Sequence, residues 1–391
     1  MESKKVLILA HKPPYPKVDG GCIAIAQILE AFIDLDVSVS FLCFETQKHP
    51  SEKLQKQPKF TYKSISINTE VGPWSAFKNL GKKASYFLDR FKHTAFENEL
   101  INALQKNNFD LIVFESLFTS NYLETVQKHS SAKIVYRSHN IEHQIWETQL
   151  VEEQNLLRKV YLKLQVKRLK NEEIKFWNKV DAISSISEKD SEFIKQHSLK
   201  KVDTVGLYCN ENHLLQKDRD NKVDFFHIGA MDWLPNQFGL NWLLDNVWEL
   251  FRTNNPTAEL HLAGKGMSEK LINTKAEGVN NHGEVADASA FMKAHKIMLV
   301  PLFSGSGIRV KIIEGMAQGK CIITTSLGAE GLSIKNKENI LIANSKEEFI
   351  AQMQFCSNQP IRVSEIGTEA RKFAKENFSK QAVSLQLKNL F

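Results

Sequence analysis

Short apolar runs alternate along the chain with longer stretches whose apolar residues recur every three or four positions. The runs that predict strands are 6–10, 37–43, 111–114, 133–136, 180–186, 225–228, 259–263, 297–301 and 321–325. Between them lie amphipathic stretches that predict helices, for example 21–32, 240–251 and 347–354. This alternation is typical of parallel β-sheets that are covered by helices on both faces. We therefore expect an α/β fold.

The predicted strands form two series, which are divided near residues 199–212. A chain of 391 residues is long enough for two or three domains. We expect two Rossmann-like domains, residues 1–200 and 201–372, joined by a short hinge. Residues 373–391 are too few for a domain, and we expect them to form a helical tail that packs back on the N-terminal domain.

Composition places the chain among ordinary globular proteins, with 42% hydrophobic and 25% charged residues. The five cysteines are odd in number and far apart, and they form no C-x-x-C pair. This usage argues for a reducing compartment and against a disulfide framework or a cysteine zinc site. The apolar run at 6–10 is too short for a signal peptide, and no segment approaches the roughly 18 apolar residues of a membrane span. We expect a cytoplasmic protein.

The segment FSGSGIRVKIIEGMAQGK contains the strongest functional signal. A turn with Gly305 and Gly307 precedes a predicted helix that carries Arg309, Lys311 and Glu314. Glycines before a helix let backbone N–H groups approach an anion, and the helix dipole adds positive potential there. A carboxylate one turn further on suits a pair of sugar hydroxyls. The pattern indicates a nucleotide or nucleotide-sugar site.

Other candidate residues follow from the position of the loops. In open parallel sheets, ligands bind beyond the carboxyl ends of the strands. The loops that follow predicted strands and carry glycine or polar side chains are 11–21, 137–143, 229–236 and 264–266. The first of these ends in Gly20 and Gly21, and the second contains His139, Asn140 and Glu142.

Together, the segments YRSHNIEH, GAMDWLPN, HGEV and GSGIRVKIIEGMAQGK resemble the retaining glycosyltransferases of family 4. The resemblance covers nearly the whole chain, from Gly20 to Gly331. It implies the GT-B fold, in which two Rossmann-like domains face a central cleft. It also implies transfer of a hexose, with retention, from a nucleotide-diphosphate sugar to a lipid-linked or other glycan acceptor in the assembly of a surface polysaccharide or glycoconjugate. Residues 1–200 would then form the acceptor side, and residues 201–372 would bind the donor.

The resemblance also assigns roles to single residues. It places Glu314 at the ribose hydroxyls, Glu284 and Val285 near the base, and His139 near the transferred sugar. The full set of donor residues that it implies is Gly229, Glu284, Val285, Ser306, Gly307 and Glu314. The residues that it implies for the phosphate and acceptor side are Gly20, Gly21, Asn140 and Glu142.

The chain departs from the family pattern at two places. The first of the family's two glutamates falls on Ser306, so recognition of the sugar hydroxyls differs there. The Arg and Lys that many members carry after the first strand of the second domain are missing, and Met231 and Asp232 lie nearby instead. We therefore expect Arg309 and Lys311 to neutralise the departing diphosphate, with His139 as the third catalytic residue. With these two cations, the reaction needs no metal ion and no cofactor.

Two alternative functions remain open from the sequence. His139, Glu142 and His143 match the H-x-x-E-H pattern of zinc peptidases, in which two histidines on a helix share a zinc ion. The second alternative is a nucleotide-sugar epimerase or binding protein with the GT-B fold. The zinc content of the purified protein separates the first alternative from a glycosyltransferase.

Charge placement suggests a membrane partner. Residues 156–179 contain eight basic and two acidic residues. The lysines that fall on one face of a helix there are Lys159, Lys163, Lys167 and Lys170. A second basic cluster at 78–92 is interleaved with aromatic residues, which suits a lipid headgroup interface. We expect binding to the anionic inner face of the plasma membrane, and no binding to nucleic acid, because no recognised module accompanies the charge.

Overall fold

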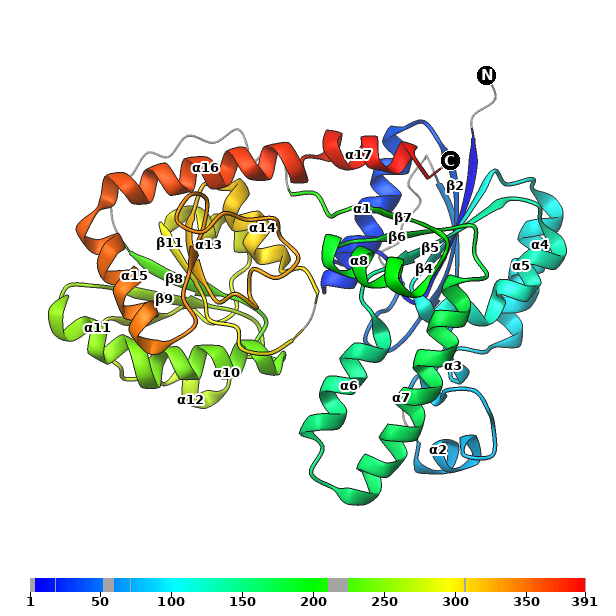
Figure 1. The fold of residues 1–391 in the computed structure, drawn as a ribbon, viewed down its shortest axis with the longest axis horizontal. Coiled ribbons are helices and arrows are strands. Elements are labelled where there is room, and N and C mark those ends of the chain that lie inside the picture. The colour runs from blue at the N-terminus through cyan, green and yellow to red at the C-terminus, as the bar shows by residue number, and fades with distance from the viewer. Residues whose placement is uncertain are drawn as a thin grey trace. The chain divides into compact units, whose positions relative to one another are not determined.

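The computed structural model describes residues 4–17, 19–51, 60–70, 72–209, 224–305 and 307–390. The chain divides into two compact units. Unit 1 comprises Met1–Leu207 and Val383–Phe391, and unit 2 comprises Tyr208–Ala382. In each unit, strands alternate with helices along the chain (Figure 1).

Unit 1 is built on a seven-stranded sheet in which all pairs of neighbouring strands are parallel. Its strands, in spatial order, are β3 (Phe60–Ser66), β2 (Ser38–Glu45), β1 (Lys5–Ala10), β4 (Leu111–Glu115), β5 (Lys133–Ser138), β6 (Ala182–Ser185) and β7 (Lys201–Thr204). The central strands β1 and β4 are buried along nearly their whole length. This burial explains their continuous apolar sequence, because helices cover both faces of a parallel sheet.

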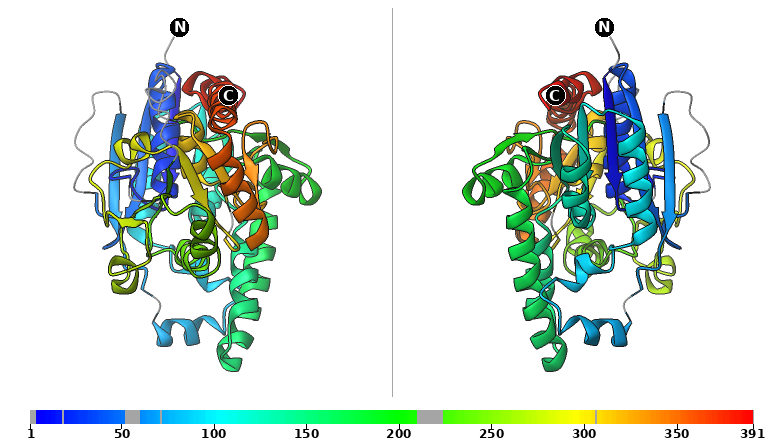
Figure 2. Two further views of the ribbon diagram at one scale, coloured as in Figure 1. Left: turned by 90° about the vertical axis from the view of Figure 1, so that its left-hand side faces the viewer. Right: turned by 90° about the vertical axis from the view of Figure 1, so that its right-hand side faces the viewer.

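The described helices of unit 1 connect these strands. They are α1 (Gly20–Asp34), α2 (Pro73–Asn79), α3 (Tyr86–Asp89), α4 (Thr94–Lys106), the 3₁₀ helix η1 (Leu117–Tyr122), α5 (Leu123–His129), α6 (Glu142–Glu152), α7 (Leu156–Trp177) and α8 (Glu188–His197). Helices α6 and α7 pack against each other and project from the sheet as a helical hairpin (Figures 1 and 2). The C-terminal end of α7 anchors the hairpin, since Phe176 and Trp177 are buried in the core beside Phe114.

Unit 2 has a six-stranded sheet that is also parallel throughout. Its strands, in spatial order, are β10 (Val279–Asn281), β9 (Leu260–Ala263), β8 (Phe225–Ile228), β11 (Ile297–Val300), β12 (Cys321–Thr324) and β13 (Leu341–Ile342). Its described helices are α10 (Leu234–Leu243), the π-helical turn η2 (Leu244–Trp248), α11 (Glu249–Asn254), α12 (Glu269–Ile272), α13 (Ala288–Ala294), α14 (Val310–Ala317), α15 (Lys346–Asn358) and α16 (Pro360–Phe378). The last helix, α17 (Lys380–Lys388), begins in unit 2 and continues into unit 1.

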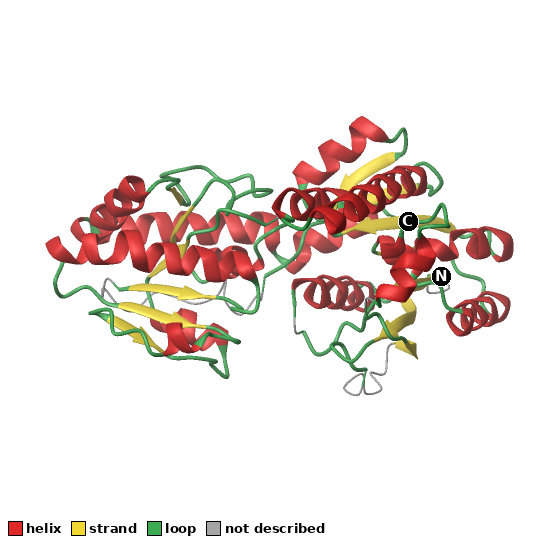
Figure 3. Cartoon of the chain, turned by 90° about the horizontal axis from the view of Figure 1, so that it is seen from below, coloured by secondary structure: helices red, strands yellow, loops and turns green. Residues whose placement is uncertain are grey.

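The two faces of the second sheet carry separate cores. Phe225 contributes to a core that includes residues of α10, α11 and α15, whereas its neighbour Phe226 contributes to one that includes residues of α13, α14 and α16. Successive residues of a strand point to opposite faces, so both must be apolar when helices cover both sides. Helices flank the strands in Figure 3. The predicted α/β fold with two parallel, Rossmann-like sheets is thus confirmed.

The predicted domain boundary after residue 372 and the predicted hinge both differ from what the structure shows. The boundary predicted after residue 372 falls inside α16, which continues to Phe378. In unit 1, β7 occupies residues that were expected to form the hinge. Residues 210–212 of that hinge lie outside the described part of the chain.

Two further properties concern the environment of the protein. All five cysteines are free and buried, and burial raises the pKa of the Cys22 thiol to about 11. No described helix is both long and apolar enough to cross a bilayer.

Candidate functional site

In unit 2, the end of β8 and the start of α14 meet at Lys311. Its ammonium donates to the carbonyl oxygen of Ile228 at 3.2 Å and to Oδ1 of Asn236 at 2.8 Å. Asn236 is held in turn by its Nδ2, which donates to the carbonyl of Ala230 at 2.8 Å. A Cβ atom on Gly229 would lie 3.0 Å from the ammonium. Lys311 therefore places a positive charge against the backbone turn that follows β8.

The position of Lys311 changes the pKa of its side chain. Burial, together with repulsion from Arg309, lowers its pKa to about 7. An ammonium that has lost much of its hydration interacts strongly with an anion that comes close, because little water remains to screen the two charges. The site can therefore stabilise negative charge that develops on a phosphate.

Arg309 stabilises the glycine turn before α14 by hydrogen bonds. Gly305 and Gly307 have φ values of +98° and +84°, in the left-handed region that favours glycine. The Arg309 guanidinium donates to the carbonyls of Gly305 at 2.9 Å and Gly307 at 2.6 Å, and it lies 5.5 Å from the centre of the Trp233 ring. These contacts hold the turn in shape. Ser306 lies outside the described residues.

The loops after β8 and β9 pack with their backbones in contact. A Cβ atom on Gly264 would lie 1.9 Å from the carbonyl oxygen of Gly229, so no side chain fits there. The amide of Met231 donates to the carbonyl of Lys265 at 2.7 Å. Glycine at position 264 is therefore required by this close approach.

The remaining predicted donor residues lie on the same unit. Gly264 donates its amide to the carbonyl of Gly283 at 2.8 Å, which ties the loop after β10 to the loop after β9. On that loop, Glu284 is exposed, and Val285 packs against the core that contains α14. Glu314 is half-buried on α14, one turn beyond Lys311. The structure thus brings Gly229, Arg309 and Lys311 to neighbouring strand and helix ends.

A second group of polar residues lies at the ends of β4 and β5 in unit 1. Glu115 and Arg137 are fully buried, and Oε1 of Glu115 accepts hydrogen bonds from Nη1 of Arg137 and, at 2.6 Å, from Nε2 of His139. Burial favours the neutral carboxyl, but Arg137 and His139 outweigh it and lower the pKa of Glu115. Burial lowers the pKa of His139 despite the carboxylate. His139 is therefore neutral, with its proton on Nε2 and a lone pair on Nδ1.

The residue after Glu115 has a strained backbone. Ser116 adopts φ +101°, which is rare for a residue with a side chain, and its hydroxyl lies 2.8 Å from Nδ1 of His11. Burial, assisted by Lys12 and His139, lowers the pKa of His11 well below its ordinary value. Strain of this kind is found at functional sites more often than elsewhere.

The predicted glycine pair Gly20 and Gly21 begins α1, and Asp19 caps this helix. The Asp19 carboxylate accepts from the amide of Cys22 at 2.8 Å and from the Lys12 ammonium at 2.7 Å. A Cβ atom on Gly21 would lie 2.6 Å from the Lys12 nitrogen, whereas one on Gly20 would meet nothing within 4 Å. The first turn of α1 thus already holds a carboxylate where a phosphate was expected. His49 adds a hydrogen bond to Asp19 at 2.9 Å.

The structure contradicts a zinc-peptidase site. His143 directs Nδ1 to Oε2 of Glu173 at 2.7 Å, whereas His139 faces Glu115. Among the described residues, the groups close enough to share one metal ion do not include His139, Glu142 and His143 together. Glu173 also accepts hydrogen bonds from the amides of Glu142 and His143, at the start of α6.

Glu142 itself is buried beside a second carboxylate. Burial and the charge of Glu173 raise the pKa of Glu142 to about 8. Its carboxyl is therefore largely protonated at neutral pH, and it can donate a hydrogen bond as well as accept one. Asn140 lies close enough to form a side-chain hydrogen bond with it.

Several residues of these clusters were not identified from the sequence. Glu115 follows directly on the apolar run of β4, and a carboxylate at the carboxyl end of a parallel strand is a usable signal. Asp19 directly precedes the glycine pair, which is the signature of a helix N-cap. Asn236 lies in the loop 229–236 that the sequence singled out, but its contact with Lys311, 75 positions away, could not be read from the sequence. Lys12 lies in the loop 11–21, and its pairing with Asp19, seven positions away, was not predicted.

Part of the chain matches a known family. Residues 222–358 match the family model described as "Glycosyl transferases group 1". A protein in the cps region of Klebsiella pneumoniae, with a mass of 44.6 kDa, is 22% identical to this chain, and the similarity covers 97% of each chain.

Solved structures of low sequence identity share the fold. Sucrose-phosphate synthase from Thermosynechococcus elongatus is 13% identical, with a TM-score of 0.70 over 99% of this chain and 98% of the other. Anabaena HepE in complex with UDP is also 13% identical, with a TM-score of 0.69 over 98% of each chain. The pneumococcal O-GlcNAc transferase GtfA in complex with UDP and GlcNAc is 12% identical, with a TM-score of 0.66 over 100% of this chain and 98% of the other. Residues 222–358 therefore match the glycosyl transferases group 1, and the two parallel sheets are those of the GT-B glycosyltransferase fold.

Proposed function

We propose that the protein is a retaining glycosyltransferase of family 4 that moves a hexose from a nucleotide-diphosphate sugar to a lipid-linked or other glycan acceptor. Assembly of a surface polysaccharide is the process that we assign to it, in keeping with the relative from a cps region. Nucleotide binding is supported by HepE and GtfA, which share the fold and were solved with UDP.

The observation that carries this proposal is the position of Lys311. Cleavage of a sugar–diphosphate bond builds negative charge on the departing phosphate, and a fixed cation aimed at that charge stabilises the transition state more than the ground state. Lys311 is fixed by Ile228 and Asn236 at the end of β8, where ligands bind in open parallel sheets. In this proposal Lys311 takes the place of the family's missing cations, and no divalent ion is required for the diphosphate.

The roles of the other candidate residues follow the same scheme. Glu314 would bind the ribose hydroxyls, Glu284 and Val285 would lie near the base, and the glycine turn at Gly307 would present amides to the phosphates. In unit 1, neutral His139 offers Nδ1 as an acceptor for a hydroxyl of the transferred sugar. Glu115 orients this ring through Nε2.

A panel of nucleotide sugars tests the activity. We expect one uridine, guanosine or adenosine diphosphate sugar to raise the melting temperature, because a ligand that binds only the folded state stabilises it. That donor should be cleaved without added Mg²⁺ or Mn²⁺, and faster when a glycan acceptor is present. The anomeric configuration of the product, read by NMR, tests retention.

The outcomes separate the possible activities. A donor that binds but is neither transferred nor hydrolysed would indicate a binding protein. Conversion of the sugar while it stays attached to the nucleotide would indicate an epimerase. Either result would overturn the proposal.

The tip of the α6–α7 hairpin supports membrane binding in the proposed function. Its apolar residues are between 72% and 84% exposed. They are Val151, Leu156, Leu157 and Val160. Lys163 and Lys167 are exposed further along α7. Apolar side chains flanked by cations suit the headgroup region of an anionic bilayer. We therefore propose a peripheral enzyme at the cytoplasmic face of the membrane.

The second basic cluster, at residues 78–92, has fewer exposed aromatic side chains for membrane binding than its sequence suggested. Tyr86, Phe87 and Phe91 are core residues with 5% to 6% exposure, and Phe87 stacks on Trp146 at a ring distance of 3.8 Å. Phe77, which directly precedes the cluster, is exposed. The interleaving of aromatic and basic residues there reflects a helix packed on the core.

We expect the protein to float with liposomes that contain anionic lipid, and to do so less at high salt. Lys163→Ser with Lys167→Ser should weaken binding by about 1 kcal/mol per lysine, because each loses its attraction to the charged surface. Leu157→Ser should weaken binding to anionic vesicles without changing the salt dependence. Lys335→Ser, an exposed lysine of unit 2, is the matched control. Equal partitioning onto neutral vesicles would contradict this role.

A further inference from the structure

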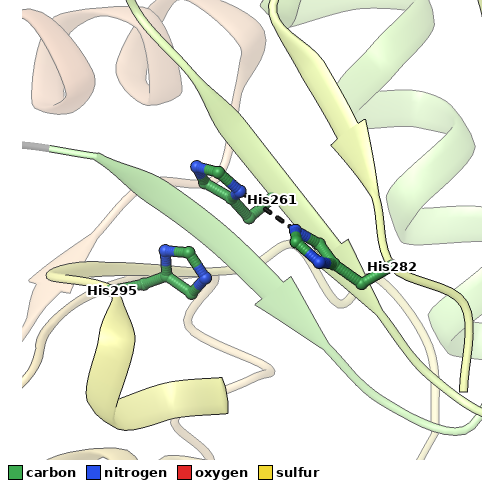
Figure 4. Close-up of side chains that lie close together, drawn as sticks. All are labelled: His261, His282 and His295. Atoms are coloured by element: carbon green, nitrogen blue, oxygen red, sulfur yellow. Dashed lines mark hydrogen bonds between the residues drawn. The ribbon is translucent and has the colours of Figure 1, made fainter. Parts of the chain in front are cut away.

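Three histidines from different parts of unit 2 lie together on one face of its sheet (Figure 4). His261 belongs to β9, His282 directly follows β10, and His295 directly follows α13. One ring nitrogen from each lies within 4.8 Å of the other two. Nδ1 of His261 lies 3.1 Å from Nε2 of His282. The fold thus gathers three imidazoles that are well separated along the chain.

A buried carboxylate fixes the orientation of His295. Oδ2 of Asp224 lies 2.6 Å from Nδ1 of His295. Since a carboxylate only accepts, this nitrogen carries the proton, and Nε2 keeps a lone pair. The other oxygen, Oδ1, accepts from the amide of Lys296 at 2.9 Å, so Asp224 is held in place from the backbone. A carboxylate behind a ligating histidine is the usual second shell of a metal site.

His261 also has carboxylates nearby, although its buried Nε2 forms no hydrogen bond to them. Its Nε2 lies on the side of two carboxylates, 3.6 Å from Oε2 of Glu259 and 3.9 Å from Oδ2 of Asp224. Its Nδ1 is left on the side of His282. Two of the three rings therefore have acidic groups behind the nitrogen that faces away from the cluster.

The spacing and the surroundings fit a zinc ion. Tetrahedral zinc with Zn–N bonds of about 2.1 Å sets its nitrogen ligands about 3.4 Å apart. The 3.1 Å between Nδ1 of His261 and Nε2 of His282 is already close to this value. The rings of His261 and His295 are stacked, with centroids 4.1 Å apart, so one of them must rotate to direct its lone pair at a shared ion. The centroid of the Phe291 ring lies 5.3 Å from that of the His282 ring and 4.7 Å from that of the His295 ring. An apolar side chain therefore borders the cluster on one side. His282 is exposed, which leaves a path for the ion and room for a water as fourth ligand.

We propose that His261, His282 and His295 bind one Zn²⁺ ion, with Asp224 as the residue that orients His295. The ion links β9, the end of the short edge strand β10 and the connection that enters β11. Its role is to hold this edge of the sheet together. His282 lies on the same loop as Glu284 and Val285, which the proposed function places near the base, but the existence of the zinc site does not depend on that function.

The other described group with metal-ligand spacing, Asp19, Cys22 and His49, does not fit a cation. The Lys12 ammonium lies 2.7 Å from the Asp19 carboxylate and already neutralises it. A metal ion there would have to displace or approach this positive charge. We therefore expect the three histidines to bind zinc and the group around Asp19 not to bind it. Variants in one group serve as controls for variants in the other.

The test uses the full-length protein without a histidine tag, stripped with a chelator and titrated with zinc sulfate. We expect one zinc per chain and a rise of roughly 3 °C or more in melting temperature. His282→Ala should weaken zinc binding about tenfold or more, and Asp224→Asn should weaken it by a similar factor. His49→Ala and His129→Ala should bind zinc like the unmodified protein. Cobalt in place of zinc should give the visible spectrum of a four-coordinate site.

Because His282 is exposed, its substitution should leave the zinc-free melting temperature unchanged, so a loss of binding cannot be attributed to misfolding. Equal zinc affinity of the His282→Ala variant would overturn the proposal. So would the absence of zinc binding by the unmodified protein, or a loss of zinc in the His49→Ala variant alone.

Discussion

Lys311→Met is expected to lower the turnover of sugar transfer about a hundredfold, the scale seen when one preorganised group is removed from a developing negative charge. Methionine keeps the length and the apolar stem of the side chain and removes only the charge. Because burial opposes the ammonium of Lys311, the variant should melt at or above the temperature of the unmodified protein. Steady-state kinetics with the donor found in the panel provide the measurement.

Three further variants serve as comparisons for Lys311→Met. Arg309→Ala removes the hydrogen bonds to Gly305 and Gly307, so it should lower the melting temperature together with turnover. Glu314→Gln should raise the apparent donor constant more than it lowers turnover, since ribose hydroxyls change little during the reaction. Lys335→Ala, at an exposed lysine, should change neither. Near-normal turnover of Lys311→Met would refute the assignment of the cation.

The pH dependence of nucleotide binding provides an independent check on Lys311. With a pKa of about 7, its amine loses its proton in the free protein as the pH rises above this value. A bound diphosphate favours the charged form, so binding must take up a proton, and affinity should fall between about pH 7 and about pH 9. Calorimetry in two buffers of different ionisation enthalpy measures this proton uptake. The Lys311→Met variant should show none in this range.

The second large effect is expected at Glu115, where Glu115→Ala should destabilise the protein by about 3 to 5 kcal/mol. The substitution leaves the Arg137 guanidinium buried without its carboxylate, and an uncompensated buried charge is costly. It also frees His139 from the hydrogen bond that sets its orientation. Urea unfolding at neutral pH measures the change in the free energy of unfolding.

The neighbouring variants distinguish loss of charge pairing from loss of packing. Glu115→Leu combined with Arg137→Met removes both charges and should recover much of the lost stability, because a buried ion pair contributes little beyond its apolar replacement. Glu99→Ala breaks an exposed pair with Lys63 at 2.8 Å and should cost at most about 1 kcal/mol. If the double variant is as unstable as Glu115→Ala, the charge of Arg137 is not the cause.

The strands predicted from apolar runs are the interior strands of the two sheets. The four that were not predicted, β3, β7, β10 and β13, are the edges of those sheets. An edge strand has one neighbour and is partly exposed, so polar residues such as Lys63 in β3 and Asn280 in β10 are tolerated. Interior strands are covered on both faces and must be apolar. Apolar runs in the sequence therefore predict the interior strands of a parallel sheet but do not predict its edge strands.

The candidate site was predictable to the extent that it depends on local sequence. The glycine turn with Arg309, and the helix that carries Lys311, follow from residues close together in the chain. The partner of Lys311, Asn236, lies 75 positions away, and Glu115 lies 24 positions from His139. Such pairs depend on which strands lie side by side, and strand order is set by packing across the whole sheet.

The buried cysteines have a practical consequence for chemical labelling. Alkylating and maleimide reagents need an accessible thiolate, and all five native thiols are enclosed in the folded chain. A single cysteine placed at an exposed position such as Leu157 would therefore react alone, without prior removal of the native cysteines. A fluorophore or spin label at the hairpin tip could then report, by its spectrum, whether this part of the chain is in water or in a lipid environment.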